Sequence, residues 1–342
     1  MNDTFLKACR GEKVDYTPVW LMRQAGRYMK EYQEVRSKVD FLTLCKTPEL
    51  AAQVTLQPVD ILGVDAAILF SDILIPVEAM GMHLEFTDKK GPLLGEPARN
   101  KSAVDRLIIP DTEDSMPFVL ETIKILRREL EDRVPLIGFS GAPFTLATYI
   151  IEGGSSKNFV HTKKMMYQNA GLFNGLMEKI TSTVVEYLSA QIKAGAQAVQ
   201  IFDSWAGILS PFDYEEVIFP YVKKAIRALR KPGVPIIYFV NDCSGLLETV
   251  KKSGADVIGI DWRVDMYRAV KRLGKKVSVQ GNLDPCVLLG TKEHIEERVK
   301  HILNQASSAR GHIFNLGHGI LPETPVENAI AMVEAVHKYG RK

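Results

Sequence analysis

Short apolar runs rich in Val and Ile alternate with longer helical patterns along most of the chain. Three stretches share one local order, in which a helix end is followed by a glycine, an apolar run and an acidic residue: residues 62–72, 194–204 and 253–261. Glycine ends a helix in the left-handed conformation without a Cβ penalty. Nearly continuous apolar runs of this length are typical of strands buried on both faces of a parallel sheet. The repeated order therefore predicts buried strands that each follow a helix.

Five further apolar runs have the same pattern of a buried strand, which makes eight predicted strands in all. The additional runs are residues 17–21, 134–139, 234–240, 276–280 and 312–316.

Helical patterns lie between many of these strands. Apolar residues recur at every fourth position from Leu172 to Ile192, which predicts a helix with one apolar face. Thr47-Pro48 and Ser210-Pro211 have the form of an N-cap followed by a proline in the first turn. Pro58 should kink or shorten the helix in which it lies.

Eight strands separated by helices predict an α/β protein made of a single (β/α)8 TIM barrel over residues 1–342. The alternative is an open doubly wound sheet, but no G-x-G-x-x-G follows any predicted strand. Residues 83–114 are polar and contain three prolines, and this segment is expected to be an excursion from the barrel rather than a second domain.

Composition and charge narrow the class of protein. The 342 residues are 46% hydrophobic and 25% charged, with a net charge of +2, so no charge excess favours nucleic acid or a membrane surface. No apolar stretch reaches the length of a membrane span, and the N-terminus lacks the apolar core of a signal peptide. The four cysteines form neither C-x-x-C nor H-x-C. We therefore expect a reduced, cytoplasmic protein with no cysteine-based zinc site.

The loops after the strands build the active site in a barrel of this kind. Arg23 and Arg27 follow the first predicted strand, in a segment that also contains Gln24 and Gly26. Arginine binds carboxylates through a planar fork, and glycine lets the backbone approach a ligand closely. The alternative is a solvated cluster at a helix start, but the placement after a strand favours an anion site.

Other polar residues follow later strands, and each has a structural alternative. Asp72 either stabilises a cation or caps the next helix. His318 lies between two glycines, which indicates close approach by another group, although a lone histidine is more often structural. Tyr149 and Ser204 are candidates that could equally satisfy buried hydrogen bonds.

Several catalytic signatures are missing from the sequence. We find no G-x-S-x-G, no H-E-x-x-H and no cofactor fingerprint, and the loop at residues 153–156 lacks the Gly-Lys-Ser/Thr ending of a phosphate-binding loop. An enzyme with neither metal nor cofactor must act on a substrate whose own electrons can serve the reaction.

Five sequence blocks, taken together, resemble the uroporphyrinogen decarboxylase family in content and order. The longest is PVWLMRQAGRY at residues 18–28, and the second is GFSGAPFT at residues 138–145, continuing to residue 153. The others are residues 70–74, 280–285 and 315–319. The resemblance extends from about residue 5 to residue 337.

This resemblance implies a cofactor-free, homodimeric (β/α)8 enzyme. It would convert the four acetate side chains of uroporphyrinogen III to methyl groups and yield coproporphyrinogen III in haem biosynthesis. Asp72 would stabilise a protonated pyrrole intermediate, and the other expected catalytic residues are Arg23, Tyr149 and His318. The expected substrate-binding residues are Arg23, Gln24, Ala25, Gly26, Arg27, Arg36, Phe41, Asp72, Tyr149, Ser204 and His318.

Two alternatives remain at the level of sequence. One is a methyltransferase of the same barrel superfamily that acts on corrinoid or thiol substrates and holds zinc through His and Cys, which the missing H-x-C disfavours. The other is a catalytically silent tetrapyrrole-binding protein.

Overall fold

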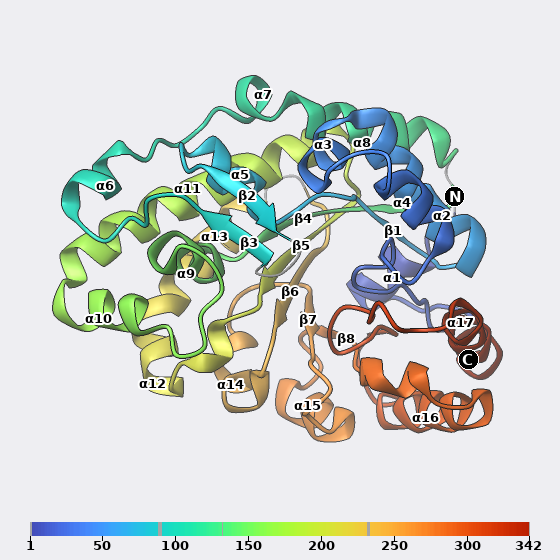
Figure 1. Cartoon of the computed structure of the whole chain (residues 1–342). Coiled ribbons are helices and arrows are strands. Elements are labelled where there is room, and N and C mark those ends of the chain that lie inside the picture. The colour runs from blue at the N-terminus through green and yellow to red at the C-terminus, as the bar shows by residue number, and fades with distance from the viewer. Residues whose placement is uncertain (1, 88–90, 132, 231–232, 342) are drawn as a thin grey trace.

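Parallel strands that follow one another in chain order form the central sheet. The computed structural model describes residues 2–87, 91–131, 133–230 and 233–341. Within these residues seven strands are joined in the order β1-β4-β5-β6-β7-β8-β9, and the curled sheet crosses the middle of the molecule (Figure 1). Their bounds are β1 Ala67–Ile68, β4 Leu136–Gly141, β5 Ala198–Asp203, β6 Ile236–Val240, β7 Val257–Gly259, β8 Ser278–Gln280 and β9 His312–Ile313.

The first predicted strand, residues 17–21, is not an extended ladder in the structure. Val19 instead forms a single parallel bridge with Phe314, just beyond β9. On its other side, Val19 accepts a hydrogen bond from the backbone of Asp65 at 2.7 Å and donates one to the Asp65 carboxylate at 2.8 Å. Residues 17–21 therefore contact the chain next to both end strands of the sheet, although the pairing is too short to count as a strand.

Helices cover the outside of the sheet, as expected for parallel strands joined by crossovers. The helix predicted from the fourfold apolar repeat is α11, and its buried residues include Leu176, Ile180, Val184 and Leu188. The larger helices are α4 Pro48–Leu62, α8 Pro117–Glu129, α9 Pro143–Glu152, α10 Val160–Gln168, α11 Ala170–Ala194, α13 Phe219–Leu229, α15 Met266–Leu273, α16 Lys292–Gln305 and α17 Val326–Tyr339. Shorter helices are α1 Thr4–Arg10, α2 Lys30–Arg36, α3 Phe41–Lys46, α5 Ile75–Ala79, α6 Lys101–Arg106, α7 Thr112–Ser115, α12 Pro211–Asp213 and α14 Leu247–Val250.

Both prolines predicted at helix starts are confirmed, although the Thr47 side chain, expected to cap α4, makes no capping hydrogen bond. Pro48 and Pro211 lie in the first turns of α4 and α12, and the Ser210 hydroxyl caps α12 by accepting from the backbone of Asp213. Pro58 does not shorten α4, which continues to Leu62.

The polar segment at residues 83–114 forms local structure of its own. Strands β2 Leu84–Thr87 and β3 Gly91–Leu94 pair antiparallel, and α6 and α7 follow them. The backbone of Leu94 donates to the carbonyl of Gly153 at 3.0 Å, and the Lys179 ammonium binds three carbonyls of residues 104–107. This segment thus packs against α9 and α11.

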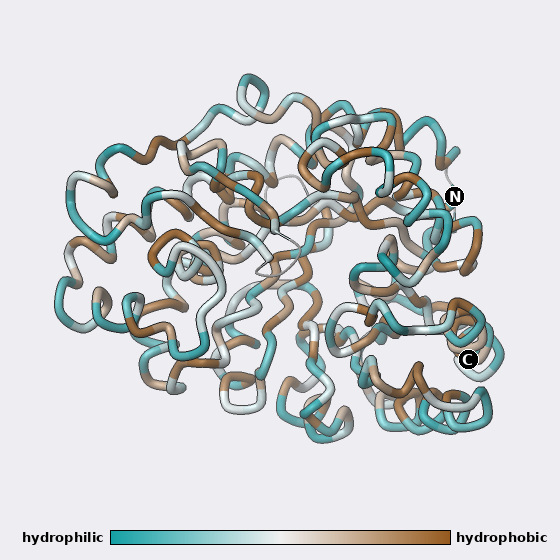
Figure 2. The backbone as a smooth tube through the Cα atoms, viewed as in Figure 1, coloured by the Kyte–Doolittle hydropathy of each residue, from teal (hydrophilic) through white to brown (hydrophobic). Residues whose placement is uncertain are grey.

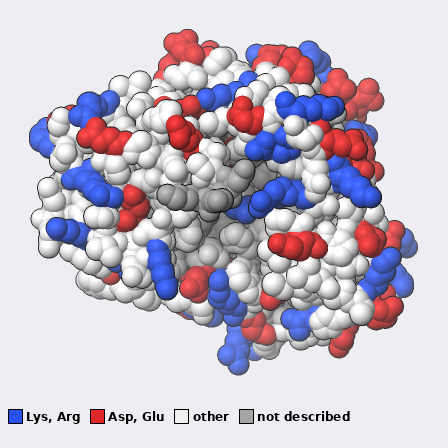
Figure 3. Space-filling model, in the orientation of Figure 1, with Lys and Arg blue, Asp and Glu red and all other residues white. Residues whose placement is uncertain are grey.

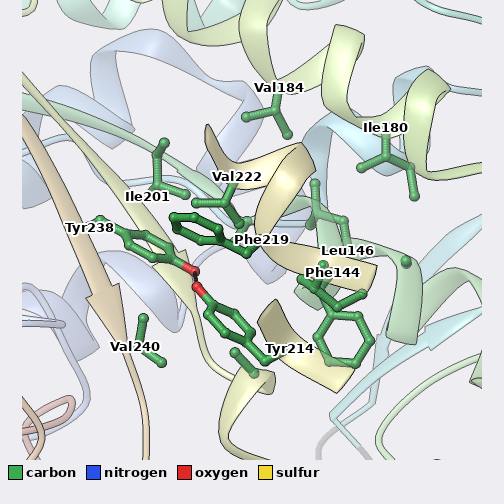
Figure 4. Close-up of a cluster of buried hydrophobic side chains, with 14 of the residues drawn as sticks. Phe144, Leu146, Ile180, Val184, Ile201, Tyr214, Phe219, Val222, Tyr238 and Val240 are labelled. Carbon is green, nitrogen blue, oxygen red and sulfur yellow. Dashed lines mark hydrogen bonds between the residues drawn. The ribbon is translucent and has the colours of Figure 1, made fainter. Parts of the chain in front are cut away.

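Apolar residues concentrate between the sheet and its helices, as the brown interior segments of Figure 2 indicate. In one such region, side chains from α9, α11 and α13 lie over β5 and β6 (Figure 4). Two tyrosines, Tyr214 and Tyr238, meet there through their hydroxyl groups at 2.8 Å. In the described part of the chain, no helix has the length and apolar character needed to cross a membrane.

Candidate active site

Arg23 lies in a sharp turn that leads away from the first predicted strand. Its φ is 61°, in the left-handed region that a side chain with a Cβ rarely adopts. The turn is held by Gln24, whose amide oxygen accepts from the backbone of Leu21 at 3.1 Å and whose amide nitrogen donates to the carbonyl of Ala66 at 3.1 Å. The arginine is thus fixed in an unfavourable conformation by its buried neighbour, and such strain is frequent at functional sites.

The glycines on both sides of His318 are explained by two close approaches. A Cβ on Gly317 would lie 2.3 Å from the backbone nitrogen of Trp262, and a Cβ on Gly319 would lie 2.5 Å from Cδ of Arg23. The segment after β9 therefore packs against the segment after β7 and beneath the Arg23 side chain. This brings residues from the two ends of the chain to one place.

His318 is largely enclosed, and its imidazole is kept neutral. Burial and, to a smaller extent, the nearby cations Arg23 and Arg263 together lower its pKa to about 4. The rings of Trp262 and Phe239 lie edge-on to it, with centroids at 6.1 and 6.5 Å. Around neutral pH His318 thus offers one hydrogen-bond donor and one acceptor, without charge.

Asp72 follows β1 and lies among protein atoms, with part of its surface still accessible. Burial raises its pKa, and a hydrogen bond from the backbone of Leu74, at 2.8 Å, and the charge of Arg23 oppose this rise; the resulting pKa is about 6. Leu74 is itself the N-cap residue of α5, so Asp72 does not cap that helix as the structural alternative expected. Asp72 instead holds the turn before α5 and presents a carboxylate beside Arg23.

Tyr149 and Ser204 come from α9 and from the end of β5. Burial raises the pKa of the Tyr149 hydroxyl, the charge of Asp72 raises it as well, and that of Arg23 lowers it. The ring of Tyr149 lies 6.3 Å from that of Trp205, the residue after Ser204. Arg23, Asp72, Tyr149 and His318 thus form one electrostatically coupled group, with Ser204 on the adjoining loop.

Arg27 and Arg36 line an open groove of about 430 Å³. Both guanidinium groups act on the pKa of Tyr32, which burial raises to about 12. Arg36 also donates to the carbonyl of Val39 at 2.6 Å. The groove is lined by Arg27, Tyr32, Gln33, Arg36, Ser37 and Val39.

Phe41 packs against the segment that carries Asp72. Its ring lies 5.9 Å from that of Phe70, two residues before Asp72, and 4.7 Å from that of Phe86 in the hairpin. Ala25 is partly buried against the core, and a Cβ on Gly26 would fall 2.9 Å from the carbonyl oxygen of Arg23. The side of the molecule that faces the viewer in Figure 1 has a hollow near its middle, with Lys and Arg side chains along one border (Figure 3).

A buried carboxylate missed by the sequence reasoning lies behind Ser204. Asp203 accepts hydrogen bonds from the hydroxyls of Thr145, at 2.8 Å, and Tyr238, at 2.7 Å, and burial raises its pKa to about 6. The Thr145 hydroxyl also accepts from the backbone of Trp205 at 3.3 Å. The network therefore braces the loop that carries Ser204, and an acidic residue at a strand end was its only sequence signal.

Grouped metal ligands are not found in the residues that the structure describes: no three His, Cys, Asp or Glu side chains lie together there as a metal site would require. All four cysteines are described and free, with Cys286 exposed and the other three buried.

Comparison with known proteins identifies close relatives over the full length. Residues 1–339 match the family model for uroporphyrinogen decarboxylase (URO-D). Curated proteins named uroporphyrinogen decarboxylase from Geobacter metallireducens and Geobacter sulfurreducens are each 58% identical over 342 residues, covering 100% of both chains. A third, from Desulfotalea psychrophila, is also 58% identical over 342 residues and 100% of both chains.

A solved structure resembles the fold at much lower identity. A methyltransferase from Methanosarcina mazei superposes with a TM-score of 0.84 at 22% identity, covering 99% of this chain and 98% of that one. A B12-independent methionine synthase from Shewanella gives a TM-score of 0.58 at 14% identity, over 88% of this chain and 91% of that one. At these identities the likeness concerns the fold alone.

Proposed function

Because the chain belongs to the uroporphyrinogen decarboxylase family, we propose that the group around Arg23 and Asp72 is where it decarboxylates its substrate. The chain is a carboxy-lyase that acts on uroporphyrinogen in tetrapyrrole biosynthesis. The finer proposal is that all four acetate side chains of uroporphyrinogen III become methyl groups, which yields coproporphyrinogen III.

The electrons of the reaction can be balanced within the substrate. A pyrrole ring carbon accepts a proton, and the resulting cation accepts the electron pair of the bond between the acetate methylene and its carboxylate. Carbon dioxide leaves, and a proton added at the exocyclic methylene with loss of the ring proton gives the methyl group. Each acetate thus consumes one proton and releases one carbon dioxide, so the step needs neither an oxidant nor a reductant.

Asp72 is the group that we assign to stabilise the cationic intermediate. Its carboxylate lies in a low-dielectric surrounding, where a fixed charge acts strongly on charge that develops nearby. Pyrrole N–H groups would donate to it, so the intermediate would gain more from the carboxylate than the neutral ring does. This differential interaction is what lowers a barrier.

The groups around Asp72 hold the reacting side chain. Arg23 binds the acetate carboxylate, and because arginine stays charged at neutral pH it donates hydrogen bonds rather than a proton. Tyr149, Ser204 and His318 supply uncharged hydrogen-bond donors at the same wall of the site. A neutral His318 suits this function, since it adds no positive charge beside a developing cation.

Some of the remaining predicted binding residues would contact the substrate, and the others hold the turn at Arg23. Arg27 and Arg36 along the groove suit the carboxylates that are not reacting, and Phe41 offers an apolar wall between them and Asp72. Both ends of the Gln24 amide bind backbone, so it acts by fixing Arg23. Ala25 and Gly26 leave space for the turn and for the approach of substrate.

The observation that carries the proposal is the coupling of Asp72 with Arg23 in one enclosed group. Anaerobic incubation of the purified protein with uroporphyrinogen III, followed by chromatography, tests it. We expect species with seven, six, five and four carboxylates to appear in order. An unchanged octacarboxylate would reject the activity, and would favour a protein that binds tetrapyrroles without turnover.

The single closed barrel over residues 1–342, with residues 83–114 as an excursion, also stands as a proposal. Residues 17–21 would be the eighth strand, a view supported by the bridge from Val19 to Phe314 and the two bonds from Val19 to Asp65. Hydrogen exchange tests it: the amides of Val19 and Trp20 should be protected as strongly as those of β4. Exchange within seconds would indicate an open sheet edge.

A homodimer in the cytoplasm completes the proposal. The dimer rests on family resemblance. The cytoplasmic location is supported by the four cysteines, which are all free, because disulfides are rare in the reducing cytosol. Sedimentation equilibrium should give twice the chain mass of 38.2 kDa. A mass of one chain would reject the dimer, and fractionation of cells tests the location.

A further inference from the structure

Arg263 is a half-exposed arginine that follows β7, at the same end of the sheet as the proposed active site. Its side chain is 44% exposed, and its guanidinium carbon lies 3.8 Å above the ring centroid of Trp262. Nη1 donates to the side chains of Asn241 at 3.3 Å and Asp261 at 3.4 Å. Trp262, Asn241 and Asp261 therefore hold the guanidinium in one orientation, so it would lose less conformational entropy when it binds a ligand.

Donors of this guanidinium remain for a ligand. Both of its side-chain hydrogen bonds use Nη1, and among the described residues none engages Nε or Nη2. The neighbouring Asp261 carboxylate is fully buried and also accepts from the backbone of Cys243 at 2.7 Å and of Arg263 at 2.9 Å. Because Asp261 is satisfied by backbone donors and meets Arg263 only at a long distance, it orients the arginine without occupying its fork.

The position of Arg263 connects it to the proposed site through two rings. The Trp262 ring lies beneath the guanidinium and edge-on to His318, with ring centroids 6.1 Å apart. Arg263 and Arg23 both lower the pKa of His318, so both cations lie near this imidazole. They come from segments after different strands, so Arg263 adds a second positive charge beside His318 from the segment that follows β7.

We propose that Arg263 binds a propionate carboxylate of the substrate through Nε and Nη2. The inference rests on the proposed function, because it assumes that uroporphyrinogen occupies the site. Its eight carboxylates outnumber the three arginines that follow the first predicted strand, Arg23, Arg27 and Arg36. A propionate held beyond Trp262 does not react, so its bond to Arg263 is equally strong in the ground state and in the transition state. The loss of Arg263 should therefore raise KM and leave kcat unchanged.

Three variants test this assignment with uroporphyrinogen III. Arg263→Gln removes the charge, Arg263→Lys keeps the charge without the fork, and Arg268→Gln is a matched control on α15 that removes an exposed arginine five positions along the chain. We expect KM to rise about tenfold in Arg263→Gln and less in Arg263→Lys, with kcat within about twofold of wild type. The increase of KM with salt should be shallower in Arg263→Gln than in the control.

Competition with coproporphyrinogen, which retains the four propionates and lacks the acetates, gives a second measurement. Its inhibition constant should rise in Arg263→Gln by the same factor as KM. Equal KM values in Arg263→Gln and Arg268→Gln, or a loss of kcat at unchanged KM, would overturn the assignment. If wild type itself fails to turn over, the proposed function fails instead. Because coproporphyrinogen binding needs no turnover, a selective loss of its binding would still support the Arg263 site.

Discussion

Arg23 lies directly against Gly319, at the point where a Cβ would approach its Cδ to 2.5 Å. Any side chain at position 319 must displace the arginine, whose own backbone is held at a φ of 61°. The two residues are separated by almost the whole chain, and their contact couples the segment after the first predicted strand to the segment after β9.

We predict that Gly319→Ala impairs catalysis more than folding. The obstructing atoms belong to a long side chain that can move, so the change in unfolding free energy should stay below about 1 kcal/mol. Misplacement of Arg23 should lower kcat/KM by about 10- to 100-fold. The control is Gly171→Ala, where a Cβ meets nothing within 4 Å. Activity of Gly319→Ala equal to that of the control would show that the position of Arg23 is not critical.

Asp72→Asn should lose activity and gain stability. The amide oxygen can still accept from Leu74, but it carries no charge to stabilise a cation, so kcat should fall at least about 100-fold. A carboxyl with a pKa of about 6 when folded is destabilising in its charged form, and its removal should raise the unfolding free energy at pH 7 by about 1–3 kcal/mol.

The pH dependence of the wild-type enzyme should report the same carboxylate. As pH falls through about 6, Asp72 gains a proton and kcat/KM should decline. Near-normal turnover of Asp72→Asn, or a kcat/KM that stays level down to pH 5, would contradict the assignment of Asp72 as the stabilising charge.

His318 should remain neutral throughout the physiological range. Burial and two nearby arginines lower its pKa to about 4, so it becomes charged only well below pH 5. NMR of protein with labelled histidine should show no titration of the His318 ring between pH 5.5 and 8. A midpoint near 6.5 would mean that the site is far more hydrated than its geometry indicates.

Asp203 should make stability depend on pH in the direction opposite to that of a salt-bridged carboxylate. Its pKa of about 6 means that the folded protein holds this proton more tightly than the unfolded chain does. Its contribution to stability is greatest below the usual carboxyl pKa and is lost as pH rises through about 6. Urea unfolding of wild type and Asp203→Asn at pH 5 and 7 measures the difference.

The wild type should lose about 1–3 kcal/mol more than Asp203→Asn between these two pH values. Thr162→Ser, in a buried hydroxyl position that contacts Glu152 instead, is a control that should follow the wild type. Identical pH dependence in wild type and Asp203→Asn would show that Asp203 is already ionised at low pH.

Turnover should survive the removal of metal ions. The proposed chemistry draws its electrons from the pyrrole, so prolonged dialysis against a strong chelator should leave kcat unchanged. Metal analysis of the dialysed protein is the control that makes the result meaningful. Loss of activity that returns on addition of one particular metal ion would overturn the cofactor-free mechanism.

The sequence by itself determined the order of the elements and the identity of the polar residues at the strand ends. Local periodicity is sufficient for this, because each buried strand and each amphipathic helix carries its pattern within a few residues, as α11 does from Leu172 to Ile192. The glycines beside His318 even indicated a close approach, since only glycine leaves such space.

Tertiary structure alone decided which of these residues meet and in what state of charge. The raised pKa of Asp72, the lowered pKa of His318 and the orientation of Arg263 by Trp262 and Asn241 depend on groups far apart in the chain. Burial and electrostatic interaction are set by distances in space, which no local pattern encodes. For the same reason, residues 17–21 have the sequence pattern of a strand but form only a single bridge to Phe314. The number of backbone hydrogen bonds that they form depends on the segments next to them in space.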